Sequence, residues 1–193
     1  MISIKRLDTG RTWLACAGLA ALCCLPCMAG TALRTDAAKS NVAAVFRQMG
    51  VPVEGRFEKF NARIEFDAAR PELSRANAEI DVASFNLGDA EFNKEALKKE
   101  WFDAARFPRA AFVSTAMTAL GGDRFEVIGR LSIKGRTADV RFPMRLTRQG
   151  GVTIFEGSLP IRRLAFNIGE DAWSDTGLVA DEIVIKFRIV TST

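Results

Sequence analysis

Several carboxylates in the chain are spaced closely enough to act together as an acid and a base. Glu100 lies three residues before Asp103, and Glu170, Asp171 and Asp175 share one short segment. A carboxylate pair supports proton transfer when its environment raises the pKa of one member. The second group lies in an irregular stretch typical of a solvated loop, so the sequence favours catalysis by these residues less than it favours binding.

The residues that usually complete a catalytic or metal site are absent. Ser174 precedes Asp175, but the chain has no histidine and hence no Ser-His-Asp triad. The four cysteines all lie near the N-terminus, at Cys16, Cys23, Cys24 and Cys27. Without cysteine or histidine in the rest of the chain, we expect no catalytic residues, no disulfide and no metal there.

The N-terminal residues have the pattern of an export signal. Lys5, Arg6 and Arg11 precede an uncharged run over residues 12–30, and Cys27-Met28-Ala29 is a small-x-small cleavage site. We expect residues 1–29 to be a signal peptide and residues 30–193 to form one domain. An uncleaved membrane anchor is the alternative, because the run is about as long as a short membrane-spanning helix.

The charge of the chain argues against a nucleic-acid partner. The 27 basic and 23 acidic residues give a net charge of +4, and no long run carries one sign. The 14 phenylalanines, with no tyrosine and no histidine, instead suit a dry interior.

Alternation of apolar and polar residues predicts an all-β fold. Eight strands are expected near residues 42–48, 54–67, 76–82, 110–119, 125–133, 140–146, 155–161 and 183–189, with a loose lead-in over residues 30–40. Short turns join most of these strands, which fits an antiparallel barrel or a two-sheet sandwich.

One segment has helical spacing instead. Phe92 lies four and five residues before Ala96 and Leu97, and Trp101 lies five and four residues after them, within 89–108; the residues between them are mostly charged. Asp89 can cap this helix, and Glu95 and Lys99 form a supporting i,i+4 pair. We expect a helix over about residues 89–100 that covers one end of the sheet. A plain packing helix and a lid over a barrel are equally good interpretations.

Small residues at inward positions favour a hollow barrel. They are Ala44, Ala62, Ala76, Ala78, Gly129 and Gly157, at places where a filled core usually holds Leu, Ile or Val. The alternative is that they make room for neighbouring phenylalanines. Eight strands enclose either a filled core or space for one slender ligand.

Four sequence blocks resemble a known family when taken in order. They are residues 46–57 (FRQMGVPVEGRF), 101–108 (WFDAARFP), 129–135 (GRLSIKG) and 163–169 (RLAFNIG). These blocks are similar to those of the YceI-like family of polyisoprenoid-binding proteins. The resemblance implies an eight-stranded lipocalin-like barrel in the bacterial periplasm that holds a long isoprenoid, such as a polyprenyl phosphate or a quinone tail.

The chain departs from this family at its polar positions. Many members have a histidine where Gln48 stands, and several have an Arg, Asp and His cluster where residues 92–96 lie. Gln48 can still bind a neutral quinone or hydroxyl. A phosphate would instead need Arg162, Arg163 or Lys94.

These considerations give a set of expected ligand contacts. Inward aromatic residues are expected to line the lipid tail, Trp101 and Phe102 to plug one end, and two polar side chains to meet the head group. The full set is Phe46, Gln48, Phe57, Phe66, Ile80, Trp101, Phe102, Phe112, Phe142, Phe155 and Arg163. The predicted function is an exported lipid carrier without a cofactor. The alternatives are an accessory partner of a membrane quinone or cytochrome system and, less favoured, an enzyme acting on an isoprenoid.

Overall fold

Antiparallel strands account for most of the structure, a computed structural model that describes residues 31–192. The predicted signal peptide lies outside these residues. The strands are β1 (Thr31–Thr35), β2 (Asn41–Gln48), β3 (Val51–Phe57), β4 (Phe60–Phe66), β5 (Arg75–Asp81), β6 (Phe85–Asn86), β7 (Arg109–Gly121), β8 (Arg124–Ile133), β9 (Arg136–Gln149), β10 (Val152–Arg162) and β11 (Glu182–Ser192). The helices are α1 (Ala90–Ala96) and the short 3-10 turns η1 (Ala37–Lys39), η2 (Pro71–Leu73), η3 (Val82–Ser84), η4 (Arg163–Phe166) and η5 (Asp171–Ser174).

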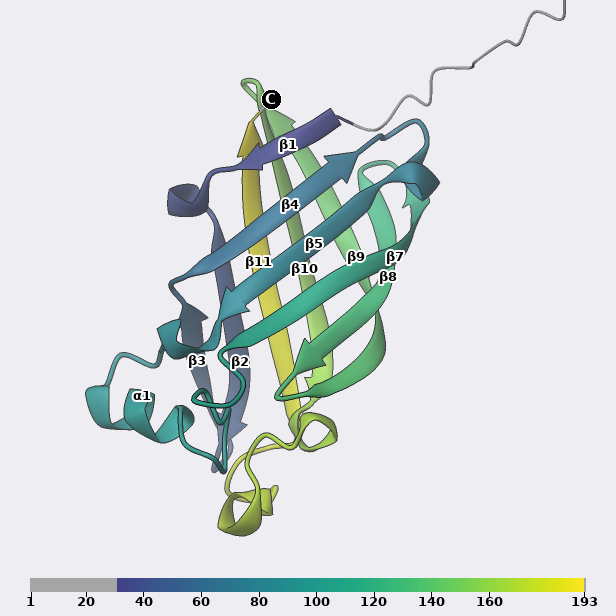
Figure 1. The fold of residues 1–193 in the computed structure, drawn as a ribbon. Coiled ribbons are helices and arrows are strands. Elements are labelled where there is room, and N and C mark those ends of the chain that lie inside the picture. Colours follow the sequence, from purple (N-terminus) through teal and green to yellow (C-terminus); the bar gives the residue numbers. More distant parts are fainter. Residues whose placement is uncertain (1–30, 193) are drawn as a thin grey trace, which may run out of the picture.

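Eight of these strands close into a barrel, as predicted. They follow the order β1, β4, β5, β7, β8, β9, β10 and β11, and β11 pairs back onto β1 through Arg34 with Ser192 and Thr35 with Thr191 (Figure 1). β10 occupies one edge of β11, so β2 pairs with the same edge as β1, nearer the start of the strand, and continues into β3 and β6. Closure pairs both edges of every strand in the ring over at least part of its length.

Two expectations about the strands were wrong. The lead-in contains β1, which closes the barrel, although its short sequence TALRT shows little apolar alternation. The single strand expected over 54–67 is two strands, because Glu58 and Lys59 turn the chain and bond to Ser84. Phe57 and Phe60 both line the interior, so the inward phase changes from odd to even residue numbers at this turn.

The predicted helix is present but shorter than expected. Asp89 caps α1 by accepting hydrogen bonds from the backbone N–H groups of Glu91 and Phe92, and the helix ends at Ala96. The chain then folds back, with the N–H of Phe102 donating to the carbonyl of Ala96. Glu95 pairs with Lys98 rather than with Lys99.

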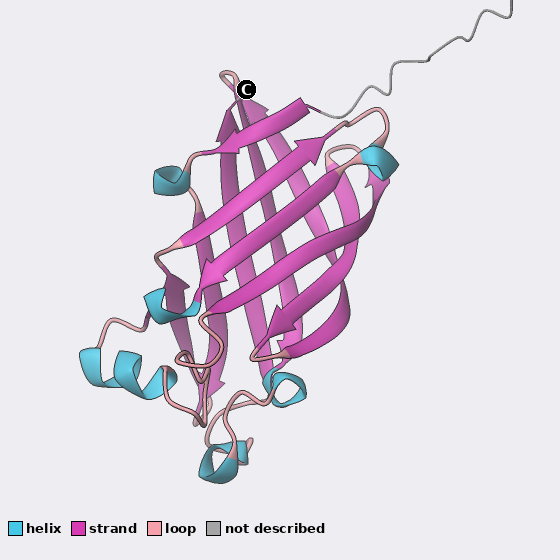
Figure 2. Ribbon diagram, viewed as in Figure 1, coloured by secondary structure: helices cyan, strands magenta, loops and turns pink. Residues whose placement is uncertain are grey.

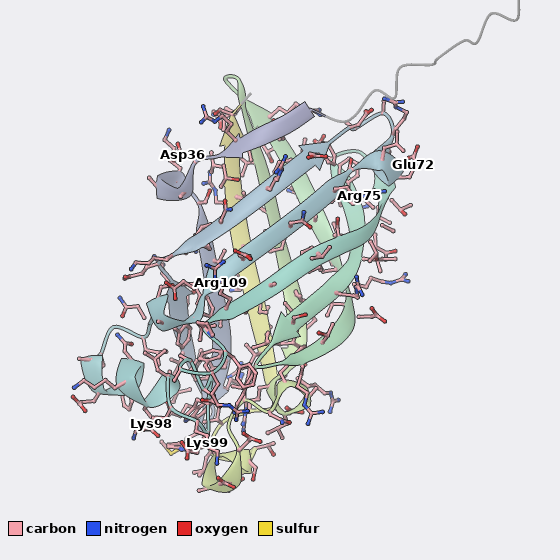
Figure 3. The ribbon with its side chains drawn as sticks, viewed as in Figure 1. Asp36, Glu72, Arg75, Lys98, Lys99 and Arg109 are labelled. Atoms are coloured by element: carbon pink, nitrogen blue, oxygen red, sulfur yellow. The ribbon has the colours of Figure 1, made fainter. Side chains whose placement is uncertain are left out.

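The helices gather at the ends of the barrel, and its wall is made of strands (Figure 2). The loop that precedes β11 lies at the same end as α1, whereas β1 lies at the other end (Figure 1). Charged side chains such as Arg75 and Arg109 lie on the outer surface, and Lys98 and Lys99 follow α1 (Figure 3). No helix within residues 31–192 combines the length and the apolar character that crossing a membrane requires.

Aromatic residues close the barrel at the end opposite α1. Phe66 packs edge-on against Phe125 and Phe155, with ring centroids 5.1 and 5.4 Å apart, and all three side chains are buried. Apolar side chains also fill this region around them, including Leu146 and Ile189. This end of the barrel is therefore a conventional packed core.

Candidate functional site

The barrel encloses an apolar cavity of about 150 Å³, here called the inner chamber. Its wall combines small residues from β4 and β5, including Ala62, Ala76 and Ala78, with rings from β7 and β9, including Phe112 and Phe142. Ala76 and Ala78 point into the barrel yet keep part of their surface accessible, because the space beside them is empty. An apolar cavity of this size stays dry and accepts a molecule as large as benzene.

The small inward residues serve two different purposes. The alanines leave space, as expected for a hollow barrel. The glycines instead seat phenylalanines: a Cβ at Gly129 would lie 2.6 Å from the ring of Phe112, and one at Gly157 would lie 2.5 Å from Phe187. The barrel is therefore hollow only in part.

A second chamber of about 320 Å³, the mouth chamber, lies beneath α1. β2 contributes Phe46 and Gln48, α1 contributes Phe92 and Glu95, and the loop before β11 contributes Val179. Trp101 and Trp173 also line this chamber, and their rings lie 5.2 Å apart. The mouth chamber is thus a mixed space, with apolar walls and a few polar groups.

Three phenylalanine rings separate the two chambers. Phe57 lines the inner chamber, Phe85 lines the mouth chamber, and Phe102 lines both. Their ring centroids lie 4.8 to 6.1 Å apart. Because Phe102 lines both chambers, its side chain is part of the partition between them.

Two polar groups of the mouth chamber lack hydrogen-bond partners. The indole N–H of Trp101 is buried and has no partner within residues 31–192. The amide of Gln48 makes no side-chain hydrogen bond to any residue in this range either. A buried donor without a partner costs about 1–3 kcal/mol, so an acceptor placed here would be stabilised.

The charged groups of the chambers are all acidic. Asp89 and Glu95 line the mouth chamber, and no Lys or Arg of residues 31–192 lines either space. Both carboxylates already have partners, since Asp89 caps α1 and Glu95 pairs with Lys98. The chambers therefore offer an anion no cation with which to pair.

Arg163 does not reach either chamber, contrary to expectation. Its side chain is fully buried, and its five N–H groups donate to five backbone carbonyls at 2.7 to 3.1 Å. These carbonyls belong to residues 168, 169, 173, 179 and 180. Burial lowers the pKa of the guanidinium, and Asp181 partly opposes this effect. Arg163 fixes the loop before β11 and has no donor left for a ligand.

Lys134 makes a second buried attachment at the same end. Its ammonium donates to the carbonyls of Lys99 and Asn167 and to Glu170, at 2.6 to 2.7 Å. The hydrogen bond from Lys134 lowers the pKa of Glu170. The β8–β9 turn is thereby tied to the segment after α1 and to the loop that contains Glu170.

Most of the predicted contact residues fall around the two chambers. The inner chamber has Phe57, Ile80, Phe102, Phe112, Phe142 and Phe155, and the mouth chamber has Phe46, Gln48 and Trp101 together with Phe102. Phe66 lines neither chamber, because it packs against Phe125 and Phe155 at the closed end.

Several lining residues were not predicted from the sequence. Phe187 lies in the alternating run of β11, so its inward position was a readable signal. Phe85 lies in a two-residue strand without a pattern, and Val179 and Trp173 lie in an irregular loop. Nothing in the local sequence marks these three.

The candidate catalytic carboxylates do not form an evident acid–base pair. Asp103 is buried beside Arg106, and Glu170 is bonded to Lys134. The side chain of Asp175 accepts the backbone N–H of Gly177. No group of three or more potential metal ligands occurs within residues 31–192.

Comparison with known proteins points to one family. A family model described as a YceI-like domain matches residues 33–191. The crystal structure of Burkholderia cenocepacia BcnA is 47% identical, has a TM-score of 0.79, and covers 81% of this chain and 98% of its own.

More distant relatives share the fold or part of the sequence. A polyisoprenoid-binding domain from Saccharophagus degradans, implicated in plant cell wall breakdown, has a TM-score of 0.68 at 16% identity and covers 84% of this chain and 98% of its own. A UPF0312 protein of Pseudomonas savastanoi is 36% identical over 88 residues, which are 46% of each chain. The chain thus spans about half the length of this curated relative.

Proposed function

The chain belongs to the YceI-like domain family, and we propose that it is a binding protein that carries the apolar chain of an isoprenoid lipid. The observation that carries this proposal is the pair of chambers that meet at Phe102, one wholly apolar and one with a few polar groups. This arrangement suits a ligand with a long tail and a small head group. The name of the S. degradans neighbour agrees with it, although at 16% identity that likeness concerns the fold alone.

The volumes set the capacity of the site. The inner chamber alone holds a group about the size of benzene, which is roughly one isoprene unit. The two chambers of 150 and 320 Å³ together make 470 Å³, which lies within the range of about 300–1,000 Å³ typical of ligand pockets. A chain of several units therefore requires Phe102 and its neighbours to move.

Burial of the tail supplies the affinity. Each methylene removed from water contributes about 0.8 kcal/mol, so one five-carbon unit contributes about 4 kcal/mol. Affinity should therefore rise with chain length until the joined chambers are full. The head group then needs to contribute little more than orientation.

The polar groups favour a neutral head group over a phosphate. Gln48 and Trp101 can hydrogen-bond a carbonyl or hydroxyl oxygen. A phosphate would lie near Asp89 and Glu95 without a cation to pair with, and an unpaired buried charge is costly. Of the two ligands that the family resemblance suggested, the chambers fit a quinone better than a polyprenyl phosphate.

The test is a matched comparison of head groups. A prenyl quinone, a prenyl alcohol and a prenyl phosphate of equal chain length are titrated into the protein in the same detergent. We expect the two neutral lipids to bind at least about tenfold more tightly than the phosphate, since an unpaired buried charge costs more than 1.4 kcal/mol. Equal or tighter binding of the phosphate would refute the neutral head group. Failure of all three to bind would refute the carrier function.

Export to the periplasm is also part of the proposal. It rests on the basic, apolar and small-residue pattern of residues 1–29. The N-terminus of the protein recovered from cell fractions tests it, and we expect the chain to begin at Gly30.

A further inference from the structure

The exposed apolar residues of the barrel are concentrated around the mouth chamber. Four of the large ones form what we call the rim patch: Met49, Val51, Phe92 and Leu178, with 70%, 63%, 58% and 42% of their surface exposed. They come from the β2–β3 turn, α1 and the loop before β11. Adjacent large apolar side chains in water mark an interaction surface.

The rim patch is continuous with the chamber wall. Phe92 itself lines the mouth chamber. The other three patch residues are close in sequence to lining residues: Met49 follows Gln48, Leu178 precedes Val179, and Val51 lies two residues before Val53. The N–H of Met49 donates to the carbonyl of Leu178 at 2.8 Å, which holds the turn against the loop. The side chains that face water therefore stand at the opening of the site.

The conformation of Met49 adds a second observation. Met49 and Gly50 have φ values of +49° and +80°, as in the tight hairpin turn that favours Asn-Gly. An unbranched apolar side chain gains nothing from this left-handed backbone conformation, and 70% of Met49 remains in water. Neither the turn nor the core accounts for methionine here, so its side chain is suited to a contact outside the protein.

We propose that the rim patch docks the mouth of the barrel onto the surface of a phospholipid bilayer. The inference rests on the proposed function, because an isoprenoid resides in a bilayer and would otherwise have to cross water to reach the chamber. The patch consists of separate tips around an opening, which suits shallow insertion among lipids better than a continuous protein interface. Arg47 donates to the carbonyl of Gly50, and Lys94 and Lys98 pair with neighbouring glutamates. Arg47 keeps its charge, but the two lysines are already paired, so apolar insertion contributes most of the docking energy and salt affects it little.

Vesicle binding tests the proposal. The full chain is expressed with its leader, and the soluble form that the cells release is used after its intact mass has identified the N-terminus. The test variant is Met49→Asn/Leu178→Gln, which keeps the favoured turn and changes no residue that lines a chamber. The matched control is Leu73→Gln/Leu120→Gln, whose residues are 44% and 48% exposed and lie near the β4–β5 and β7–β8 turns at the other end (Figure 1).

We expect the wild type and the control to co-float with phosphatidylcholine vesicles at both low and high salt. The test variant should bind at least about tenfold less, because two of the four inserting side chains become polar. It should also extract a prenyl quinone from vesicles correspondingly more slowly, with unchanged affinity for the quinone presented in detergent.

Three results would overturn docking. The first is that the wild-type protein does not bind vesicles, and the second is that the test variant binds them as well as the wild type does. The third is that the rim patch joins two copies of the chain, so that the wild type is a dimer and the test variant is a monomer. Each of them leaves quinone binding in detergent intact. Loss of that binding in the wild type would instead refute the proposed function.

Discussion

Filling the inner chamber with a side chain tests the cavity most directly. Ala78 lies on β5 opposite Ala62 on one side and Phe112 on the other, and it lines the chamber. Ala78→Leu adds three carbons where the structure has empty space. In a packed core the same change costs about 1–3 kcal/mol, because the added atoms force neighbours out of position. The sign of the stability change therefore distinguishes a cavity from a filled barrel.

The magnitude follows from the volume. At about 24 cal/mol per Å³, an empty space of 150 Å³ costs the fold about 3.6 kcal/mol. Three buried carbons recover up to about 2.4 kcal/mol, or roughly 5–10 °C in the melting temperature of a chain of this size. The same three carbons occupy space that a lipid tail would use, so tail affinity should fall by up to about 50-fold.

Chemical denaturation and lipid titration of the same preparation measure the two effects. Ala43→Leu is the matched control, because Ala43 is 1% exposed and lines neither chamber. We expect this control to lose about 1–3 kcal/mol of stability. The reasoning is wrong if Ala78→Leu destabilises the protein as much as the control does, or if it stabilises the protein without weakening lipid binding.

Three further predictions concern the attachments and the partition. Arg163→Lys replaces five donors by three, so at least two buried carbonyls lose their partners. We expect denaturant unfolding to show that the free energy of unfolding falls by about 3 kcal/mol or more. A fall below about 1 kcal/mol would contradict this. The lowered pKa of Glu170 means that its bond to Lys134 stabilises the fold above the ordinary carboxyl value of 4.5 and is lost as the pH falls through the lowered value. Melting curves between pH 3 and 7 should therefore show less pH dependence in Glu170→Gln, by a small amount because the side chain is 41% exposed. Phe102→Ala should join the chambers and lower the free energy of unfolding by about 3 kcal/mol. In titrations with a series of prenyl alcohols, the variant should then bind longer chains best compared with the wild type. An unchanged length preference would show that Phe102 is not the partition.

Alternation of residue types was sufficient to identify most of the barrel wall. The runs at 125–133 and 140–146 correspond to β8 and β9, and Val127 lies opposite Phe142 in their register. Both side chains line the inner chamber. Because the side-chain period of a strand is two, residues of this kind can be assigned to the inner face without knowledge of the partner strand.

The remaining features depend on contacts between distant segments. β1 closes the ring with only a few residue pairs on each side, so its sequence needs no apolar alternation. The early end of α1 follows from Phe102, whose backbone N–H returns to Ala96 as its ring reaches the chambers. Helical spacing alone continues past that point and cannot reveal the fold-back.

Arg163 shows why polar residues were the hardest to assign. In the sequence it follows another arginine at the end of a strand, which is typical of a solvated position or a site for an anion. Its five acceptors are carbonyls that only the folded loop brings together. With Lys134, it satisfies the polar backbone of this end with cations that are already bonded within the protein. The end of the barrel at α1 can therefore be held together without presenting a cation to the chambers, and this leaves the apolar tail and the weak hydrogen-bonding capacity of Gln48 and Trp101 to select the ligand.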